Sequence, residues 1–504
     1  MSSKINEPEI PGRIIAQIAI APAKNKYAKL GEYDLITIHD GARLDKSLVR
    51  GFCVERDGYF RLEPIIIGRD CVVNTLTQVS PGARLADGTV WGPQASSHEE
   101  PSSDAYAAFN RSAGPRPSLW LIIFVGIPIK YLVTLICYVP WVAALFMLLS
   151  QPFAFNKHDS VKGVIAWFAY PRRIGWHYVA RIVRNSMPPL INVILGIIVK
   201  RSFGLNREGS MRNATELSLL RRWFNTELLS QPQLRRAFAI LGTHYEMTSV
   251  LFRAMGARVG KRVYWPGSGI YCPDPELLEI GDDVVFGSRS EVFTSDSIGW
   301  ARVRVGRGAM IADRVVLLPG CSIGKQCVMG SGALARRNGY YEDNSVWMGA
   351  KNGEAVSFGK AAKQEGPLGE EETLTPFGRA FYKRKASFFV FPYLMLVLIN
   401  VGMAILSSAY WATPAAGTIL LLNFLRIRFE DTASVLFDDH WYRPGLLYAA
   451  IAISFVIMMF IQAMLAFAWV IGTKWAIIGR RREGRYDWDK SSYCQRWQLH
   501  LTLQ

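Results

Sequence analysis

A six-residue rhythm of aliphatic residues is the feature of this sequence that most restricts its fold. From Arg302 the chain reads RVRVGR-GAMIAD-RVVLLP-GCSIGK-QCVMGS-GALARR, in which an aliphatic residue recurs every six positions, often beside glycine or another turn former. An amphipathic helix would need a period near 3.6, and an ordinary hairpin sheet would need simple alternation. Three hexads can instead form one triangular coil, with aliphatic side chains stacked inside and Gly, Asp or Asn at the corners. The pattern predicts a left-handed parallel β-helix.

The hexad pattern occurs twice in the chain. Residues 65–97 align with residues 303–335 without a gap, so that Gly68 falls on Gly306. The first copy is shorter and is interrupted by FCVERDGYFRLEP, whereas the second carries the insert SDSIGWA before its longest uninterrupted run. We therefore predict two β-helix domains in tandem, at residues 1–98 and 256–358.

Four stretches are more apolar than a soluble core needs, and each is long enough to cross a bilayer at about 1.5 Å per helical residue. Pro128 and Pro140 allow the first to form either one tilted span or a hairpin, and the second is either a span or an interfacial helix. A further apolar segment, 413–429, is expected to be a buried or re-entrant helix. The four stretches are residues 119–150, 187–204, 387–411 and 445–478.

The fold class expected for the whole chain is therefore two β-helix domains that alternate with transmembrane α-helical bundles. Two domains on the same side of a membrane must be separated by an even number of membrane crossings. We therefore expect four to six spans in total, in two bundles. The remaining boundaries are linkers at 99–118 and 359–386, membrane segments at 119–204 and 387–479, a helical connector at 205–255, and a basic amphipathic tail at 480–504.

The net charge of +17 is spread along the chain rather than gathered in one segment. Many basic residues flank apolar runs, as in YPRRIGWH, IVKRSFG and IIGRRREGR, which is typical of the cytoplasmic edge of a bilayer. This placement predicts an integral membrane protein that contacts lipid, with its β-helix domains on the cytoplasmic side. No nucleic-acid-binding module is recognisable, so we expect no nucleic-acid partner.

The seven cysteines are scattered and form no CxxC motif. A disulfide framework or a zinc site would need paired spacings that this chain lacks. We expect free thiols that act as small apolar residues, and no bound metal.

A second duplication follows the membrane segments. Residues 203–228 resemble residues 477–501, because both contain Arg-Glu-Gly and then Arg-Trp: Arg207-Glu208-Gly209 and Arg222-Trp223 in the first, Arg482-Glu483-Gly484 and Arg496-Trp497 in the second. The larger repeating unit is thus a β-helix, a linker, a membrane bundle and a helix with this motif. No β-helix follows the second motif, so we expect the chain to be split, truncated or secondarily ended relative to the repeating unit.

These features together resemble the C-terminal membrane region of poly-lysine-synthetase-type nonribosomal peptide synthetases, including fungal relatives. The resemblance covers nearly the whole chain and is clearest from Arg221 to Ala335. It is carried by RRWFNTEL, LGTHYEMTSVLFRAMGARVGKRVYWPGSG, PDPELLEIGDDVVFGSRSEVFTSD, GAMIADRVVLLPG and VMGSGALA.

The resemblance implies a membrane-embedded scaffold whose acyltransferase-like β-helix domains join aminoacyl units delivered as thioesters. Because adenylation and carrier sequences are absent here, activation is expected to come from a separate adenylation or carrier protein. The coil loops read FCVERDGYF and FTSDSIGWA, where some relatives carry a THxFED-like histidine motif.

Acyl transfer needs a base near the nucleophile and a donor for the developing oxyanion. His244, close to Glu246 in GTHYEM, is the first candidate for the base, and His39, beside Asp40, is the second. Each histidine could equally be structural or at the surface.

The stretch GSRSEVFTSD offers charge and hydroxyl groups on a loop that leaves the coil, and such loops are common functional sites. Asp296 could orient a cationic amine, and Arg289 could hold a phosphopantetheine phosphate. Glu291, Thr294 and Ser295 complete the predicted substrate-binding or donor-binding group. The alternative is a set of coil corners with local Asp and Ser hydrogen bonds.

Three functions are compatible with these observations. The first is a membrane aminoacyltransferase or acyltransferase that moves a group from a phosphopantetheine-linked or CoA thioester to an amine-bearing small molecule, with no bound cofactor. The second is a non-catalytic scaffold or export partner for a separate synthetase, and the third is a CoA-dependent O-acyltransferase. Since related β-helix enzymes place sites between subunits, we expect either pairing of the two copies within the chain or a homo-oligomer, with any chemistry around the second copy.

Overall fold

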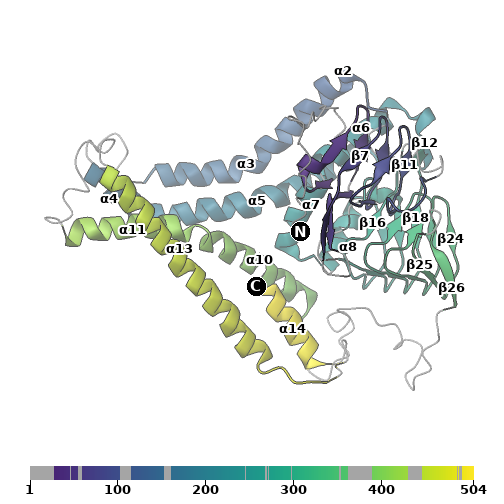
Figure 1. Ribbon diagram of the computed structural model, residues 1–504. Coiled ribbons are helices and arrows are strands. Elements are labelled where there is room, and N and C mark those ends of the chain that lie inside the picture. Colours follow the sequence, from purple (N-terminus) through teal and green to yellow (C-terminus); the bar gives the residue numbers. More distant parts are fainter. Residues whose placement is uncertain are drawn as a thin grey trace, which may run out of the picture. The chain divides into compact units, whose positions relative to one another are not determined.

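The computed structural model of the chain divides into two compact units (Figure 1). One unit comprises residues 1–115, 207–214 and 287–362, and the other comprises residues 116–206, 215–286 and 363–504. The structure describes residues 28–45, 47–54, 59–102, 115–151, 161–243, 246–266, 270, 272–296, 298–350, 354–360, 389–429, 445–484, 486 and 491–504.

The first hexad module folds into coils of short parallel strands within the first unit. Arg84 pairs with Ile66 and Val90 with Val72, each 18 residues away, which is three hexads per turn of the coil. The antiparallel hairpin β5 (Phe52–Val54) and β6 (Phe60–Leu62) forms the interruption that the sequence placed here. The coil strands are β1 (Lys29–Leu30), β2 (Ile36–Ile38), β3 (Arg43–Leu44), β4 (Leu48–Val49), β7 (Ile65–Ile67), β8 (Val72–Val73), β9 (Gln78–Val79), β10 (Arg84–Leu85) and β11 (Val90–Trp91), in the sheets β1-β4-β9, β10-β7-β2 and β11-β8-β3.

The second hexad module follows the same rule with a longer regular run. Arg304 pairs with Ser322 and Met310 with Val328, again 18 residues apart and parallel. Its strands in this unit are β16 (Glu291–Val292), β18 (Val303–Val305), β19 (Met310–Ile311), β20 (Val316–Leu317), β21 (Ser322–Ile323), β22 (Val328–Met329), β23 (Leu334–Ala335), β24 (Tyr340–Tyr341) and β25 (Ser345–Met348), and β26 (Val356–Lys360) closes antiparallel on β25. The prediction of a parallel β-helix built from hexads is confirmed.

The side chains at every sixth position form the core of this coil. They are at most 3% exposed, and burial of each aliphatic side chain stabilises the coil by roughly 1.5–3 kcal/mol relative to exposure. The corner glycines are required sterically: a Cβ on Gly306 would lie 2.6 Å from the backbone carbon of Gly324 in the next coil. The six-residue core series is Val305, Ile311, Leu317, Ile323, Met329 and Ala335.

The second unit contains the first rungs of that module and the helices that precede them. These rungs are β13 (Arg258–Val259), β14 (Leu278–Ile280) and β15 (Val285–Phe286), and β13 pairs in parallel with β14. Helices α6 (Glu216–Leu228), α7 (Gln231–Leu241) and α8 (Glu246–Ala254) form the helical connector. Stacked rings of Phe252, Trp265 and Phe286 join α8 to the rungs, with centroid separations of 4.9 and 5.5 Å.

Among the described residues of this unit, four helices are long and apolar enough to cross a membrane. They are Leu119–Leu149 (α2, the π-helical turn η2 at Ile122–Gly126, and α3 at Ile127–Leu149), α5 (Pro171–Phe203), α10 (Tyr393–Tyr410), and Gly445–Ile478 (α13 with the π-helical turn η8 at Lys474–Ile478). The first stretch is thus one helix, and residues 187–204 are the second half of a longer one. Figure 1 shows α3 beside α5, and α13 returning along α11 (Thr413–Arg428).

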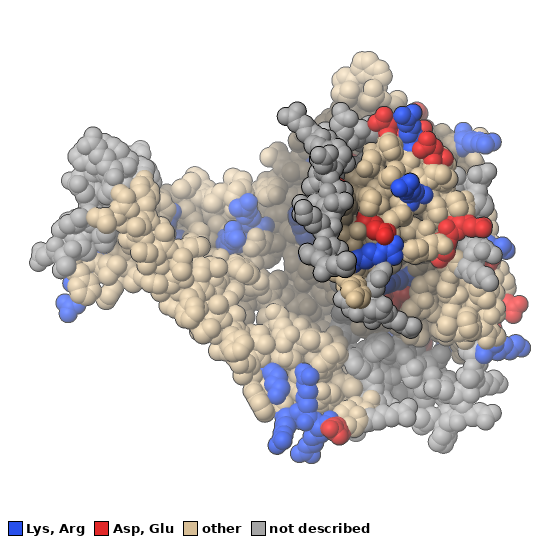
Figure 2. Space-filling model, viewed as in Figure 1, with Lys and Arg blue, Asp and Glu red and all other residues tan. Residues whose placement is uncertain are grey.

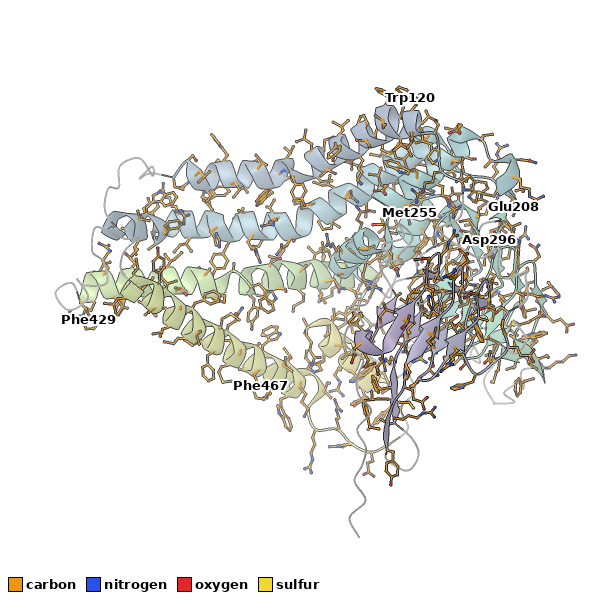
Figure 3. All side chains as sticks on the ribbon, turned by 45° about the horizontal axis from the view of Figure 1, so that its top comes forward. Trp120, Glu208, Met255, Asp296, Phe429 and Phe467 are labelled. Carbon is orange, nitrogen blue, oxygen red and sulfur yellow. The ribbon has the colours of Figure 1, made fainter. Side chains whose placement is uncertain are left out.

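The ambiguous segment 413–429 forms α11, which follows α10 nearly in line after a break at Trp411 and Ala412 (Figure 1). Gln462 of α13 stabilises this break, because its Nε2 donates to the Tyr410 carbonyl at 2.7 Å and its own carbonyl accepts from the Tyr410 hydroxyl at 2.9 Å. Large side chains of α13, such as Phe460 and Phe467, are 65% and 63% exposed. Figure 3 labels Phe467 on this helix. An apolar outer surface of this kind is the one that helices in lipid present.

The repeated Arg-Glu-Gly and Arg-Trp motifs have similar local structures. The helices before them end at Gly204 and Gly479, whose φ angles of 87° and 72° suit glycine. An arginine of the following helix then caps the exposed carbonyls: Arg221 Nε donates to Phe203 O at 2.7 Å, and Arg496 Nη1 of α14 (Ser492–Thr502) donates to Ile477 O at 3.4 Å. The two helices thus end in similar ways, although Arg221 precedes the first Arg-Trp pair whereas Arg496 belongs to the second.

Candidate functional site

The insert of the second module forms a small antiparallel ribbon on the side of the coil. Glu291 pairs with Val316, so this turn of the coil is seven residues longer than the regular 18. Within the insert, Asp296 N donates to Gly299 O at 3.1 Å and Ala301 N donates to Thr294 O at 3.0 Å. The strand β17 (Gly299–Trp300) also pairs with β12 (Gly209–Ser210), which comes from the Arg-Glu-Gly motif. The ribbon thus holds a short loop between the coil of the second module and the strand β12.

Ser295 and Trp300 lie directly opposite each other in this ribbon. The two flanking hydrogen bonds make them a non-hydrogen-bonded pair, the arrangement in which Cα atoms are closest, at about 4.5 Å, and both side chains project from one face. Ser295 is 1% exposed and Trp300 is 4% exposed. Ser295 Oγ and Trp300 Nε1 have no hydrogen-bond partner among the described residues. Two buried donors therefore share one face without a described acceptor.

Asp296 holds the turn of the ribbon. Its Oδ1 accepts from Ile298 N at 2.9 Å and from Gly299 N at 3.0 Å, and its Oδ2 accepts from Arg337 Nη1. The residue is 3% exposed, so the ion pair with Arg337 is largely shielded from water. With both oxygens occupied, Asp296 positions the neighbouring Ser295 and does not present a free carboxylate.

A second ion pair fastens the end of the insert. Glu208 Oε1 accepts from Arg302 N at 3.1 Å and from Arg302 Nε at 3.3 Å. Glu208 belongs to the Arg-Glu-Gly motif, so this motif anchors both β12 and the strand that leaves the insert. Figure 3 marks Glu208 and Asp296 on this part of the molecule.

The predicted donor-binding residues occupy different environments. Arg289 sits at a coil corner with φ of 59°, and its guanidinium is paired with Asp313, with Nη2 to Oδ2 at 2.5 Å. Glu291 and Thr294 are buried, at 3% and 0% exposure. The structure therefore brings Thr294, Ser295 and Asp296 into the ribbon, while Arg289 is engaged on the coil surface.

The predicted catalytic residues His39, His244 and Glu246 do not belong to the ribbon. His39 is exposed and follows β2 in the first module, not the insert. Glu246 belongs to the second unit, where its Oε1 accepts from Arg253 Nη1 at 2.6 Å within α8. His244 lies outside the described residues. The catalytic roles assigned to these residues stay predictions.

Sequence reasoning missed Trp300 and Arg337. Trp300 was visible in SDSIGWA, where a tryptophan among small residues of an insert is a signal for a packed or functional loop. Arg337 lies 41 residues beyond Asp296, and only the coil geometry brings the two together.

A buried polar cluster in the second unit also escaped the sequence analysis. Lys200 Nζ donates to Glu276 Oε2 at 2.6 Å and to Asn225 Oδ1 at 2.9 Å, and both Asn206 Nδ2 and Asn225 Nδ2 donate to Asp274 Oδ1. All five side chains are at most 7% exposed. Burial raises the pKa of Glu276, and the charge of Lys200 opposes that rise. The cluster ties the end of α5 to α6 and to the start of the second module.

The two hexad modules touch within the first unit. Leu76 of the first packs against a cluster of the second formed by Phe293, Val316, Leu318 and Leu334. Gln94 Nε2 also donates to Arg314 O. In the described part of the chain, no group of three or more His, Cys, Asp or Glu residues could hold a metal ion.

Comparison with known proteins gives few matches. No family model matches this chain, and no curated protein matches it. Among solved structures, the chain is similar to a maltose O-acetyltransferase from Clostridium difficile 630, with 19% identity, a TM-score of 0.21, and coverage of 26% of this chain and 85% of that one. It is also similar to serine acetyltransferase isoform 3 from Entamoeba histolytica in complex with cysteine, with 12% identity, a TM-score of 0.14, and coverage of 44% and 92%. The assignment of the β-helix rests on the coils themselves.

Proposed function

We propose that this chain is a membrane-anchored transferase that moves an acyl or aminoacyl group from a thioester to an amine, with its site at the 294–301 ribbon. The observation that carries the proposal is the Ser295–Trp300 pair. Its hydroxyl and indole N–H are buried donors on one face, which suits them to a carbonyl oxygen that gains negative charge. Loops on a rigid coil are favourable places for such a site, because the coil fixes their geometry.

The reaction follows from this placement. The amine nitrogen attacks the thioester carbonyl carbon, and the oxygen, held by Ser295 Oγ and Trp300 Nε1, becomes an oxyanion. The oxyanion collapses to the amide, the carbon–sulfur bond breaks, and the thiolate leaves. The proton lost by the amine passes to the thiolate or to water. Asp296, fixed by Arg337, keeps Ser295 in place throughout.

The membrane location is part of the proposal. The four long apolar helices support it, as does the exposed run Arg480, Arg481 and Arg482 that follows α13. Figure 2 shows this basic cluster beyond the apolar surface of α13. By the positive-inside rule these arginines belong on the cytoplasmic side, and we propose the same side for the β-helix modules.

The donor and its supplier are further proposals. A phosphopantetheine-linked or CoA thioester is the expected donor, and a separate adenylation or carrier protein is the expected supplier of an aminoacyl group. The sequence resemblance to poly-lysine-synthetase-type enzymes supports a role in nonribosomal peptide synthesis with an amine-bearing acceptor. The Leu76 and Gln94 contacts support pairing of the two modules within one chain, in place of the subunit pairing of a homo-oligomer.

A non-catalytic scaffold is the second candidate. Two observations favour it: both carboxylate oxygens of Asp296 already accept hydrogen bonds, and the described residues of the insert include no histidine. In that case the buried Ser295 and Trp300 donors would bind a partner's carbonyl group without turnover.

The test uses the full chain purified in detergent or nanodiscs. Acyl-CoA and aminoacyl-phosphopantetheine donors are supplied with a panel of amines and alcohols, and the free thiol and the product are measured. Amide product from a thioester, lost in Trp300→Phe but retained in Ser290→Ala, supports the transferase. Tight donor binding without thiol release favours the scaffold, and ester product from an alcohol alone would reassign the chain as an O-acyltransferase.

A further inference from the structure

The first half of helix α5 carries a face of basic side chains, three arginines and one histidine. Arg173, His177, Arg181 and Arg184 follow one another at intervals of three or four residues. With 3.6 residues per turn, these positions fall within about 80° of one another and extend over about 17 Å of helix. We call this set the α5 cationic face.

The α5 cationic face points between two packed neighbours of α5. On one side, Ala180 and Trp176 pack against Trp141, Ala144 and Leu148 of α3. On the other, Tyr178 and Asn185 form hydrogen bonds with Thr413 and Ser408, at 3.3 Å each. The helical repeat places the cationic face in the arc between these contacts, whereas Val179, which is 40% exposed, lies on the opposite side.

Aromatic rings surround the guanidinium groups of this face. The Arg173 guanidinium lies 4.0 Å from the ring centroids of both Trp167 and Phe168 of α4 (Val161–Phe168), and that of Arg184 lies 5.2 Å from Trp141. Arg173 is only 8% exposed. The Nε atoms of Arg173 and Arg181 are buried without a hydrogen-bond partner among the described residues.

No counter-charge is available from the helices themselves. Helices α3, α4, α5, α10, α11 and α13 contain no Asp or Glu. None of these four basic residues forms an ion pair within the described part of the chain. Cations in an apolar helical bundle are costly unless an anion joins them, and arginine forks match phosphate oxygens well.

We propose that the α5 cationic face binds the phosphate group of an anionic membrane lipid. The site lies on a helix with exposed apolar side chains such as Met187 and Ile194, so a lipid can bring its phosphate in laterally while a soluble anion would have to enter an apolar layer. The inference rests on the proposed membrane location of α5 and is independent of the transfer reaction. The membrane location is tested separately: if alkaline carbonate releases the protein from membranes, the proposal that α5 lies in the membrane is wrong.

The experiment measures lipid binding by the full chain. The purified protein is analysed by mass spectrometry for co-purified phospholipid, and its unfolding temperature is followed with phosphatidylglycerol, phosphatidylcholine or inorganic phosphate. We expect saturable stabilisation by phosphatidylglycerol alone. We expect Arg173→Gln with Arg181→Gln to weaken its apparent affinity at least tenfold, and Arg480→Gln with Arg481→Gln, which removes the same charge elsewhere, to leave it unchanged.

Two further variants keep the test decisive. If the double variant does not fold, the exposed Arg184→Gln and the charge-conserving Arg181→Lys should each weaken phosphatidylglycerol binding, since a lysine cannot form the bidentate contact. Unchanged lipid binding in these variants overturns the proposal. If inorganic phosphate raises the unfolding temperature as much as phosphatidylglycerol does, the site binds free phosphate and the proposal of a lipid ligand is overturned.

Discussion

Asp296 and Arg337 form a part-buried ion pair across 41 residues of sequence, and this pair links the insert of the second module to a later corner of the same coil. The carboxylate also caps the amides of Ile298 and Gly299, so one side chain fixes the turn of the ribbon and its attachment. The position of Ser295, the next residue in the chain, depends on this arrangement.

Replacement of Asp296 by alanine should therefore loosen the ribbon while the coil persists. The substitution removes hydrogen bonds to a charged carboxylate, which contribute about 1.5–3 kcal/mol each, and we expect the loss to destabilise the ribbon locally. Hydrogen exchange of the Ile298 and Gly299 amides should accelerate at least tenfold. The matched control is Asp313→Ala, which removes the exposed pair with Arg289 and should leave those amides unchanged. Equal protection in wild type and Asp296→Ala would contradict this role.

The Lys200–Glu276 pair should contribute strongly to the stability of the second unit. Lys200→Met leaves a buried carboxylate without its counter-charge, and we expect a loss of about 3–5 kcal/mol. Glu276→Gln combined with Lys200→Met should recover much of that loss, because the amide carries no charge. Thermal unfolding of the detergent-solubilised protein provides the measurement, and additive losses in the double variant would rule out a direct pair.

The same pair gives a pH dependence with a definite sign. Burial raises the pKa of Glu276 above its ordinary value of 4.5, and removal of Lys200 should raise it further. A carboxyl group with a raised folded-state pKa favours folding at low pH and loses that contribution as pH rises through the folded value. Lys200→Met should therefore be closest to wild type in stability near pH 5 and should fall behind as pH rises to 8. A gap that is constant with pH would contradict this assignment.

Cys321 should be inert toward alkylating reagents in the folded protein. Burial in the coil core raises the pKa of its thiol to about 12, so at pH 8 only about one molecule in ten thousand carries the reactive thiolate there. The half-exposed Cys53 of the first module is the internal control. Iodoacetamide labelling followed by peptide mass spectrometry should modify Cys53 and spare Cys321 until the coil unfolds. Equal labelling rates before unfolding would contradict the buried position.

Gln462 should stabilise the break between α10 and α11. Gln462→Leu leaves the Tyr410 carbonyl without its side-chain donor in an apolar setting, and hydrogen bonds of this kind between membrane helices contribute about 0.6 kcal/mol and at most about 1.7 kcal/mol. We expect a small fall in unfolding temperature, with a second, separate fall in Tyr410→Phe. No change in either variant would show that the two contacts carry no stability.

The sequence predicted the coil architecture because a β-helix repeats its packing every six residues and every 18 residues. The core series from Val305 to Ala335, the interruption of the first module and the extra residues of the second follow from that spacing, whereas the pairing of β5 with β6 was not predicted. The apolar helices were predictable for a similar reason, since their length and composition alone set them apart. The separation of residues 413–429 from α10 could not be predicted from the sequence. The break at Trp411 depends on contacts with Gln462, which belongs to another helix.

The candidate site was predictable only in part. Thr294, Ser295 and Asp296 were named from the hydroxyl and carboxyl groups of the insert, and they do lie together in the ribbon. Arg337 could not be paired with Asp296 from spacing alone, because the insert shifts the coil register between them. Lys200, Asn225 and Glu276 belong to three elements far apart in the sequence, and only folding assembles their cluster.

The rate of acyl transfer in variants of Ser295 and Trp300 tests the central claim most directly. Trp300→Phe keeps an aromatic side chain but replaces the indole by a smaller ring without the N–H, Ser295→Ala removes only the hydroxyl, and Ser290→Ala removes a hydroxyl of the same coil that is already bonded to Gly287 O. Loss of one oxyanion donor lowers kcat about 10²–10³-fold. We predict such a fall in kcat for Trp300→Phe and Ser295→Ala with little change in KM, and wild-type rates for Ser290→Ala. Wild-type kcat in both Trp300→Phe and Ser295→Ala would contradict the claim that this pair holds the reacting carbonyl.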